Sequence, residues 1–172
     1  MQILKSKKLL LLLIRIVAIF TLAVTTSLAQ EKTKISGKRY GVSSSSGTVK
    51  VDDTEGHIIS VGESKGFDVA TGAQFYNESF NDLVKGTGTH RGYGKAVYPD
   101  GDVSRYTFEG KINTTHLSMG KPVTTFEGTF SITGGTGKYE NAKGGGTYIG
   151  QFIGEGIFTY DWEGELVLKK SE

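Results

Sequence analysis

The sequence predicts an all-β fold, a closed antiparallel β-barrel of about eight strands. Several segments in the second half of the chain alternate apolar and polar residues with a period of two, the pattern of strands with one buried face. The chain holds 25 glycines and only two prolines, and no segment after residue 29 has a helical period. Closure into a barrel would remove exposed strand edges.

The first 29 residues have the pattern of a secretory signal peptide. A basic stretch, MQILKSKK, precedes a long apolar run, and Ser27–Ala29 offers small residues at the positions that a signal peptidase reads. We expect cleavage between Ala29 and Gln30 and a secreted or periplasmic protein. The alternative is an uncleaved membrane anchor.

Cleavage would change the charge of the protein. The segment carries four basic residues and no acid, so the net charge of +2 becomes −2. No Lys/Arg cluster remains, which argues against nucleic acid as a partner, and we expect no membrane contact after cleavage. The chain has no cysteine, which excludes disulfides and a lipid attached through a thiol.

The rest of the chain is long enough for one domain with a core. Residues 30–47 are polar and rich in Ser and Gly, so we predict a flexible leader with one short strand near Lys38–Val42. A single barrel domain would span 48–172. Its first strands are expected at 48–53 and 57–64, then near 66–70 and 82–88.

The second half gives a clearer pattern. Segments 89–98 and 102–112 flank Pro99-Asp100-Gly101, a turn sequence that predicts a hairpin. A loop at 113–122 precedes a strand at 123–133, and strands at 146–153 and 156–168 close the chain. An aromatic-Glu-Gly triplet recurs at residues 108–110, 126–128 and 162–164. Its glycine relieves crowding where a strand bends.

The stretch SITGGTGKYENAKGGGTYIGQF, residues 131–152, invites comparison with phosphate-binding loops. Gly137-Lys138 is followed by Tyr139 where a P-loop needs Ser or Thr, and a dinucleotide fingerprint starting at Gly135 would need glycine where Glu140 stands. We interpret Gly134, Gly135 and Gly137 as a structural turn, in which glycine supplies positive φ values.

No constellation in the sequence predicts catalysis or metal binding. His57, His90 and His116 lack the spacing of metal ligands. The serines of Ser43–Ser46 lie in the predicted leader, where a nucleophile could not be held in place. The carboxylates of the last strand alternate with aromatics and are expected on a solvated outer face. We therefore predict no catalytic residue, no metal and no cofactor.

The segment FEGTFSITGGTGKYENAKGGGTY resembles the signature of the allene oxide cyclase/dirigent-like barrel superfamily, and GTGTHRGYGKAVYPDGD and YDWEGEL resemble its secreted bacterial members of unassigned activity. The resemblance covers Thr87–Leu166. It implies an eight-stranded, calycin-like antiparallel barrel with an apolar interior, often trimeric in the plant relatives. Those relatives either cyclise a fatty-acid epoxide or steer the radical coupling of phenols. A fainter resemblance to the MORN repeat lacks the fixed period of repeat proteins.

The leading hypothesis is a non-catalytic barrel that binds a small apolar or aromatic molecule or serves as an interaction module. One face of the strands carries seven aromatics that would line or fill the interior: Tyr106, Phe108, Phe126, Phe130, Phe158, Tyr160 and Trp162. An eight-stranded barrel is just wide enough either to be filled by its side chains or to admit one ligand. We expect a filled core.

Two alternatives belong to other functional classes. An isomerase or cyclase acting on a hydrophobic substrate would need an ionisable residue inside the barrel, and Arg105, Glu109 or Glu127 would point inward if the strand register were shifted by one residue. A self-associating envelope or matrix protein, a homo-oligomer, would instead use the outer surface.

Overall fold

The structure is a computed structural model and describes residues 32–116, 118 and 120–168. Eight antiparallel strands close into a barrel, which confirms the predicted fold class. The strands are β1 (Lys32–Lys50), β2 (His57–Asp68), β3 (Gln74–Val84), β4 (Thr87–Val97), β5 (Val103–Thr115), β6 (Val123–Gly135), β7 (Lys143–Gly154) and β8 (Ile157–Val167), with a short 3₁₀ helix, η1 (Gly137–Tyr139), between β6 and β7. The predicted signal peptide and its cleavage site lie outside the described residues. No helix in the described part of the chain is long and apolar enough to cross a membrane.

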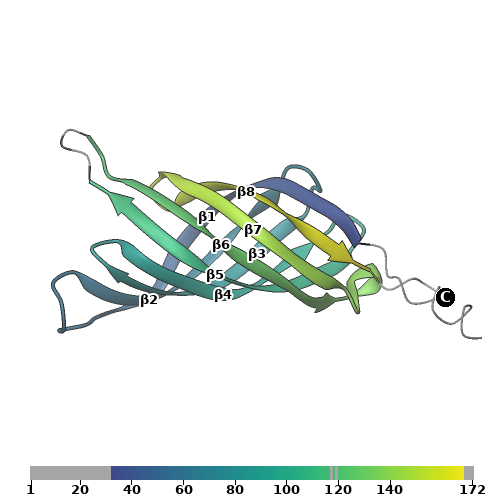
Figure 1. The fold of residues 1–172 in the computed structure, drawn as a ribbon, viewed down its shortest axis with the longest axis horizontal. Helices are drawn as coiled ribbons and strands as arrows, with labels where there is room; N and C mark the ends of the chain where they lie inside the picture. The colour runs from purple at the N-terminus through teal and green to yellow at the C-terminus, as the bar shows by residue number, and fades with distance from the viewer. Residues whose placement is uncertain (1–31, 117, 119, 169–172) are drawn as a thin grey trace, which may run out of the picture. The chain divides into compact units, whose positions relative to one another are not determined.

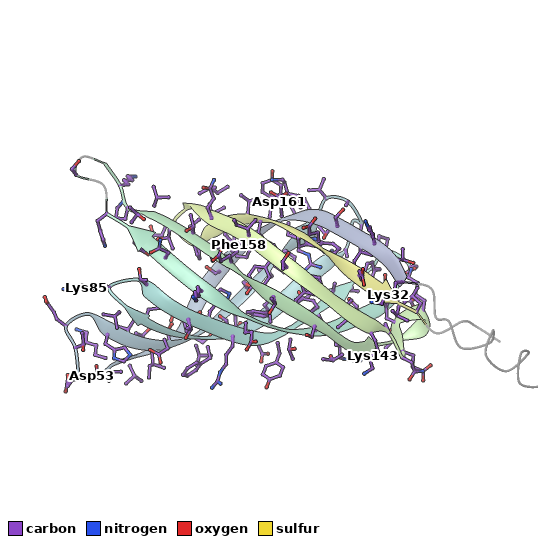
Figure 2. The ribbon with its side chains drawn as sticks, in the orientation of Figure 1. Lys32, Asp53, Lys85, Lys143, Phe158 and Asp161 are labelled. Carbon is purple, nitrogen blue, oxygen red and sulfur yellow. The ribbon has the colours of Figure 1, made fainter. Side chains whose placement is uncertain are left out.

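Each strand pairs with the next one in sequence, and β1 pairs with β8 to close the ring (Figure 1). The connections β1–β2, β3–β4, β5–β6 and β7–β8 therefore lie at one end, which we call the hairpin end. The connections β2–β3, β4–β5 and β6–β7 lie at the other, which we call the closed end. Asp53 and Lys85 mark the hairpin end in Figure 2, and Lys32 and Lys143 mark the closed end.

Interior aromatic side chains lie over glycines of neighbouring strands. Each of the seven predicted aromatics has a glycine as cross-strand partner on at least one side: Tyr106 with Gly94, Phe108 with Gly92, Phe126 and Tyr160 with Gly150, Phe130 with Gly146, Phe158 with Gly41, and Trp162 with Gly37. A Cβ atom added at Gly41 would lie 2.6 Å from Cζ of Phe158. The missing side chains leave room for rings that a barrel of this width could not otherwise hold.

A small apolar core lies at the closed end. Tyr98 and Tyr139 stack with ring centroids 4.6 Å apart. Ala142 and Leu166 are buried beside them, and Ile35 is among the partly buried residues that pack against this cluster. Because Tyr139 belongs to η1, the β6–β7 connection carries part of this core.

The first half of the chain departs from the prediction. Residues 32–50 form strand β1, which contains the short strand predicted near Lys38–Val42. The rest of the predicted flexible leader over residues 30–47 is wrong for the residues that the structure describes. No strand was predicted over residues 74–81, which belong to β3. The strand predicted at 82–88 covers the end of β3, a turn at 85–86 and the start of β4. Strands β1 and β3 turn Ser and Asn side chains inward, so they lack the apolar alternation that marks a strand with a hydrophobic inner face.

The hairpin predicted at 89–98 and 102–112 is confirmed as β4 and β5, and the strand predicted at 123–133 is confirmed as part of β6. Ordinary apolar patterning identified these strands because their inner faces carry the aromatics. The two closing strands are also present, as β7 and β8.

The glycine under Phe108 offers a test of this packing. A Cβ atom at Gly92 would meet the carbonyl oxygen of Glu78 and lie 2.5 Å from Cζ of Phe108, so neither the strand nor the ring can stay in place. We expect Gly92→Ala to lower the free energy of unfolding by about 2–3 kcal/mol in urea denaturation followed by Trp162 fluorescence. Gly47→Ala, with no atom within 4 Å of the new Cβ, is the matched control and should change it by less than about 0.5 kcal/mol. Equal losses would contradict the crowding argument.

Candidate ligand-binding cavity

The barrel encloses a cavity of about 440 Å³ whose lining comes from all eight strands. Gly86 and Thr114 are part of this lining, so the cavity reaches the rim at the hairpin end. The expectation that side chains fill the interior is therefore wrong. The volume lies in the range of cavities that hold small molecules, about 300–1,000 Å³.

One side of the cavity is aromatic. We call it the aromatic wall; it comes from β5–β8 and consists of Tyr106, Phe108, Phe126, Phe130, Tyr148, Phe152, Phe158, Tyr160 and Trp162. The structure thus brings all seven predicted aromatics together and adds Tyr148 and Phe152, which the sequence analysis did not name. Their contacts are mostly edge-to-face, as between Phe126 and Phe158 at 6.0 Å. In Figure 2 Phe158 projects into the barrel and Asp161 away from it.

The facing side is polar. We call it the polar wall; it comes from β1–β3 and consists of Ser43, Ser60, Ser64, Asn77, Ser79 and Asn81. Nδ2 of Asn77 donates to Oγ of Ser64 at 3.2 Å, and Nδ2 of Asn81 donates to Oγ of Ser60 at 3.2 Å. These bonds hold the amides in fixed orientations. Oδ1 of Asn77 accepts from the hydroxyl of Tyr106 at 2.7 Å, whereas Oδ1 of Asn81 has no donor among the described residues and is available for a guest. The cavity is therefore amphipathic.

A buried ion pair lies at the inner end of the cavity, next to the closed end. Nε of Arg39 donates to Oδ2 of Asp68 at 3.0 Å, and Asp68 is fully buried. The same oxygen accepts from Nε1 of Trp162 at 2.7 Å, while Oδ1 accepts from the backbone amides of Ala70 and Thr71. Asp68 thus accepts four hydrogen bonds, which a buried carboxylate requires.

Aromatic rings surround the guanidinium of Arg39. It lies over Phe75 and Trp162, each 5.2 Å from the ring centroid, and Nη1 donates to the hydroxyls of Tyr106 and Tyr160, both at 3.1 Å. Burial alone would lower the pKa of Arg39, but Tyr160, Tyr106 and Asp68 outweigh it and raise the pKa above its ordinary value. Arg39 stays charged under all ordinary conditions.

A second polar pair lies among the aromatics. Nε2 of His90 is 2.6 Å from the hydroxyl of Tyr148, and within the described residues Nδ1 of His90 has no hydrogen-bond partner. Burial lowers the pKa of His90 to about 4 and raises that of Tyr148 above its ordinary value. Both groups are therefore neutral at neutral pH.

The Gly134–Gly137 turn uses its own amides. The amide of Thr136 donates to the carbonyl of Val103 at 2.8 Å, and the amide of Lys138 donates to Oδ2 of Asp102 at 3.2 Å. Gly137 has φ of +53°, a conformation that favours glycine. The turn docks onto the β4–β5 hairpin, so these amides are not directed at a phosphate.

The three residues considered for catalysis lie outside the barrel. Arg105, Glu109 and Glu127 are exposed, so the shifted register that would turn them inward is wrong. The interior instead holds Arg39, Asp68 and His90, which sequence reasoning missed. Arg39 lies in the presumed leader and Asp68 at the end of a strand whose register was not fixed. Their opposite charges gave no signal in the sequence, because no local pattern sets the register that pairs β1 with β2.

No cluster of three or more His, Cys, Asp or Glu side chains in the described part of the chain is arranged to hold a metal ion. His57 lies at the hairpin end between two carboxylates, with Nδ1 2.5 Å from Asp53 and Nε2 2.7 Å from Asp82. The hydrogen bond to Asp53, then that to Asp82, raises the pKa of His57. We interpret these two hydrogen bonds as a structural link between the β1–β2 turn and β3.

Comparison with known proteins gives information about the fold but not about the function. No protein-family model matches the chain, and no curated protein matches it. A solved structure of a protein of unknown function from the DUF3224 family of Shewanella oneidensis MR-1 is similar, with a TM-score of 0.52 and 15% identity over 82% of this chain and 100% of that one. A pterocarpan synthase dirigent protein matches with a TM-score of 0.43 and 12% identity over 81% of this chain and 92% of that one.

At such identities the likeness to the DUF3224 protein shows the fold alone. The chain is thus a closed eight-stranded antiparallel barrel, shared with proteins of that kind, that carries an amphipathic cavity and a buried Arg–Asp pair. Its assignment to a particular family stays a prediction.

Removing one partner of the buried pair should be costly. Asp68→Ala would leave the charge of Arg39 uncompensated, and we expect a loss of about 3–5 kcal/mol in the free energy of unfolding. The control is Asp161→Ala, which removes the partner of Lys38 in an exposed pair and should leave the denaturation midpoint almost unchanged. A small effect of Asp68→Ala would show that the interior is better hydrated than its burial indicates.

His90 should make the protein less stable in acid. Its folded pKa of about 4 lies below the ordinary value of 6.5, so between these values only the unfolded chain binds the proton. Stability therefore falls as the pH drops from 6.5 towards 4. When the pH falls from about 7.5 to about 4.5, the free energy of unfolding of His90→Gln should decrease by about 2 kcal/mol less than that of the wild type. Urea denaturation at both pH values measures this difference.

His57 acts in the opposite direction and serves as the control. Because its pKa is raised in the folded state, His57 contributes to stability in full below pH 6.5. That contribution is lost as the pH rises through the pKa of the folded state. His57→Gln should therefore leave the acid-side loss in place. If His90→Gln and His57→Gln reduce the loss of unfolding free energy at acid pH by the same amount, the assignment of that loss to His90 is wrong.

Proposed function

We propose that this protein is a non-catalytic binder that holds one small, largely apolar or aromatic molecule inside its barrel. The observation that supports this proposal is the cavity of about 440 Å³ between the aromatic and polar walls. Aromatic side chains provide large apolar contact area, and a few fixed polar groups orient a guest.

The ionisable groups inside the barrel favour binding over acid–base chemistry. Asp68 has its oxygens occupied by four donors. His90 is neutral and its Nε2 is engaged with Tyr148. Burial raises the pKa of Tyr106, so this phenol stays protonated. An isomerase or cyclase would need a group that is free to move a proton at neutral pH.

Filling the cavity should abolish binding. We expect N-phenyl-1-naphthylamine, a neutral fluorescent probe, to bind with one molecule per barrel and to quench Trp162, the single tryptophan of the chain, by energy transfer. Ser79→Phe puts a ring into the cavity from β3 and should weaken binding at least about tenfold by occupying its volume.

Glu78→Phe is the matched control, because Glu78 precedes Ser79 on the same strand and is exposed on the outer face. It should bind the probe like the wild type. Binding that survives Ser79→Phe, or is lost equally in both variants, would place the probe elsewhere and count against the proposal.

Native mass spectrometry of the protein, purified gently from its own source, provides an independent test. We expect a retained species of a few hundred daltons, the size that a cavity of this class holds. The same spectrum reports the mass after any cleavage and the oligomeric state. A retained molecule that also stays bound to the Ser79→Phe variant would argue for a site on the outer wall.

A further inference from the structure

One nitrogen of Arg39 has no hydrogen-bond acceptor among the described residues. Nε donates to Asp68, and Nη1 donates to Tyr106 and Tyr160. Within the described residues Nη2 donates no hydrogen bond, although Arg39 is nine-tenths buried, with 9% of its surface exposed. A guanidinium has five N–H donors, and a buried donor without an acceptor destabilises the folded state.

The free nitrogen faces the cavity. Arg39 is one of the residues that line it. Among the described residues, the buried side-chain polar atoms without a partner are Nδ1 of His90 and Oγ1 of Thr159. Nη2 of Arg39 is not one of these sealed atoms, so it keeps accessible surface, and the accessible space next to Arg39 is the cavity. A guest molecule can supply the acceptor that the protein does not.

The charge of the ion pair limits what that acceptor can be. Asp68 already neutralises Arg39 at 3.0 Å inside the barrel. A carboxylate on the guest would add a second negative charge next to a neutral pair, and burying an uncompensated charge is unfavourable. An uncharged carbonyl oxygen accepts the same hydrogen bond without that cost, and a bond to a charged donor is among the stronger ones.

Resting on the proposed function, we infer that the guest is an uncharged aromatic molecule with a carbonyl-type oxygen at its buried end, and that Arg39 selects it through Nη2. The oxygen points towards the closed end, because Arg39 lies there. The ring system then lies against the aromatic wall, for which Phe126 and Phe158 provide the central surfaces. Any further polar group of the guest faces the polar wall.

Three probes of similar shape test this inference by competition against N-phenyl-1-naphthylamine: 2-acetylnaphthalene, 2-ethylnaphthalene and 2-naphthoate. The first has the carbonyl, the second lacks the oxygen, and the third is an anion. In the wild type we expect 2-acetylnaphthalene to compete at least about tenfold better than 2-naphthoate.

The double variant Arg39→Met/Asp68→Leu removes the donor without leaving a buried charge. Retained near-ultraviolet circular dichroism checks that the barrel is folded, and N-phenyl-1-naphthylamine, which has no carbonyl oxygen for Nη2, serves as the reference ligand for each protein. The preference for 2-acetylnaphthalene over 2-ethylnaphthalene should fall about tenfold relative to the wild type. Arg39→Lys keeps the charge opposite Asp68 but lacks the third nitrogen, so its preference should fall in the same direction.

The outcomes separate the inference from the function on which it rests. If N-phenyl-1-naphthylamine binds in the cavity but the ketone preference is the same in all three proteins, Arg39 does not select the guest. If 2-naphthoate competes best, the guest is an anion and the inference fails, while the cavity still binds. If the wild type binds none of the probes, the proposed function fails and the inference fails with it.

Discussion

The narrow width of an eight-stranded barrel is the constraint on which the rest of this structure depends. Nine large aromatic side chains point into an interior that is only just wide enough for side chains to fill. The chain accommodates them by placing glycine opposite each predicted ring, so that ring and missing side chain share one space. Other glycines let neighbouring backbones approach closely, as between Gly110 and Gly128. The cavity is the space that remains after the aromatic rings have packed over their partner glycines.

The sequence revealed the half of the barrel whose inner face is apolar. Strands β4–β8 follow period-two alternation, so the fold class, the hairpin around Pro99 and the inward aromatics could be predicted. Most of β1 and β3 could not be predicted, because serines and asparagines face inward there and the residues resemble a loop. A strand with a polar inner face lacks the apolar alternation by which strands are usually recognised. In this protein such strands form the polar wall of the candidate site.

The ionisable centre was hidden for a related reason. Arg39 and Asp68 are 29 residues apart and meet only because β1 and β2 pair in the observed register, which no local pattern specifies. Their neighbours come from further still, with Trp162 and Tyr160 on β8. The pair thus adds side-chain hydrogen bonds between the first two strands and the last one, where the backbone ladder of β1 and β8 closes the ring.

The order of the strands also has an evolutionary consequence. Because every strand neighbours the next one in sequence, the polar wall is encoded by one continuous stretch, β1–β3, and the aromatic wall by another, β5–β8. Substitutions at Ser60, Ser79 or Asn81, on β2 and β3, can change which hydrogen bonds a guest finds without touching the glycines on which the rings lie. Strand β1 is less free to diverge, because its Gly37 and Gly41 make room for Trp162 and Phe158 of β8. The part of the gene best placed to diversify the contents of the barrel is therefore the segment that encodes β2 and β3.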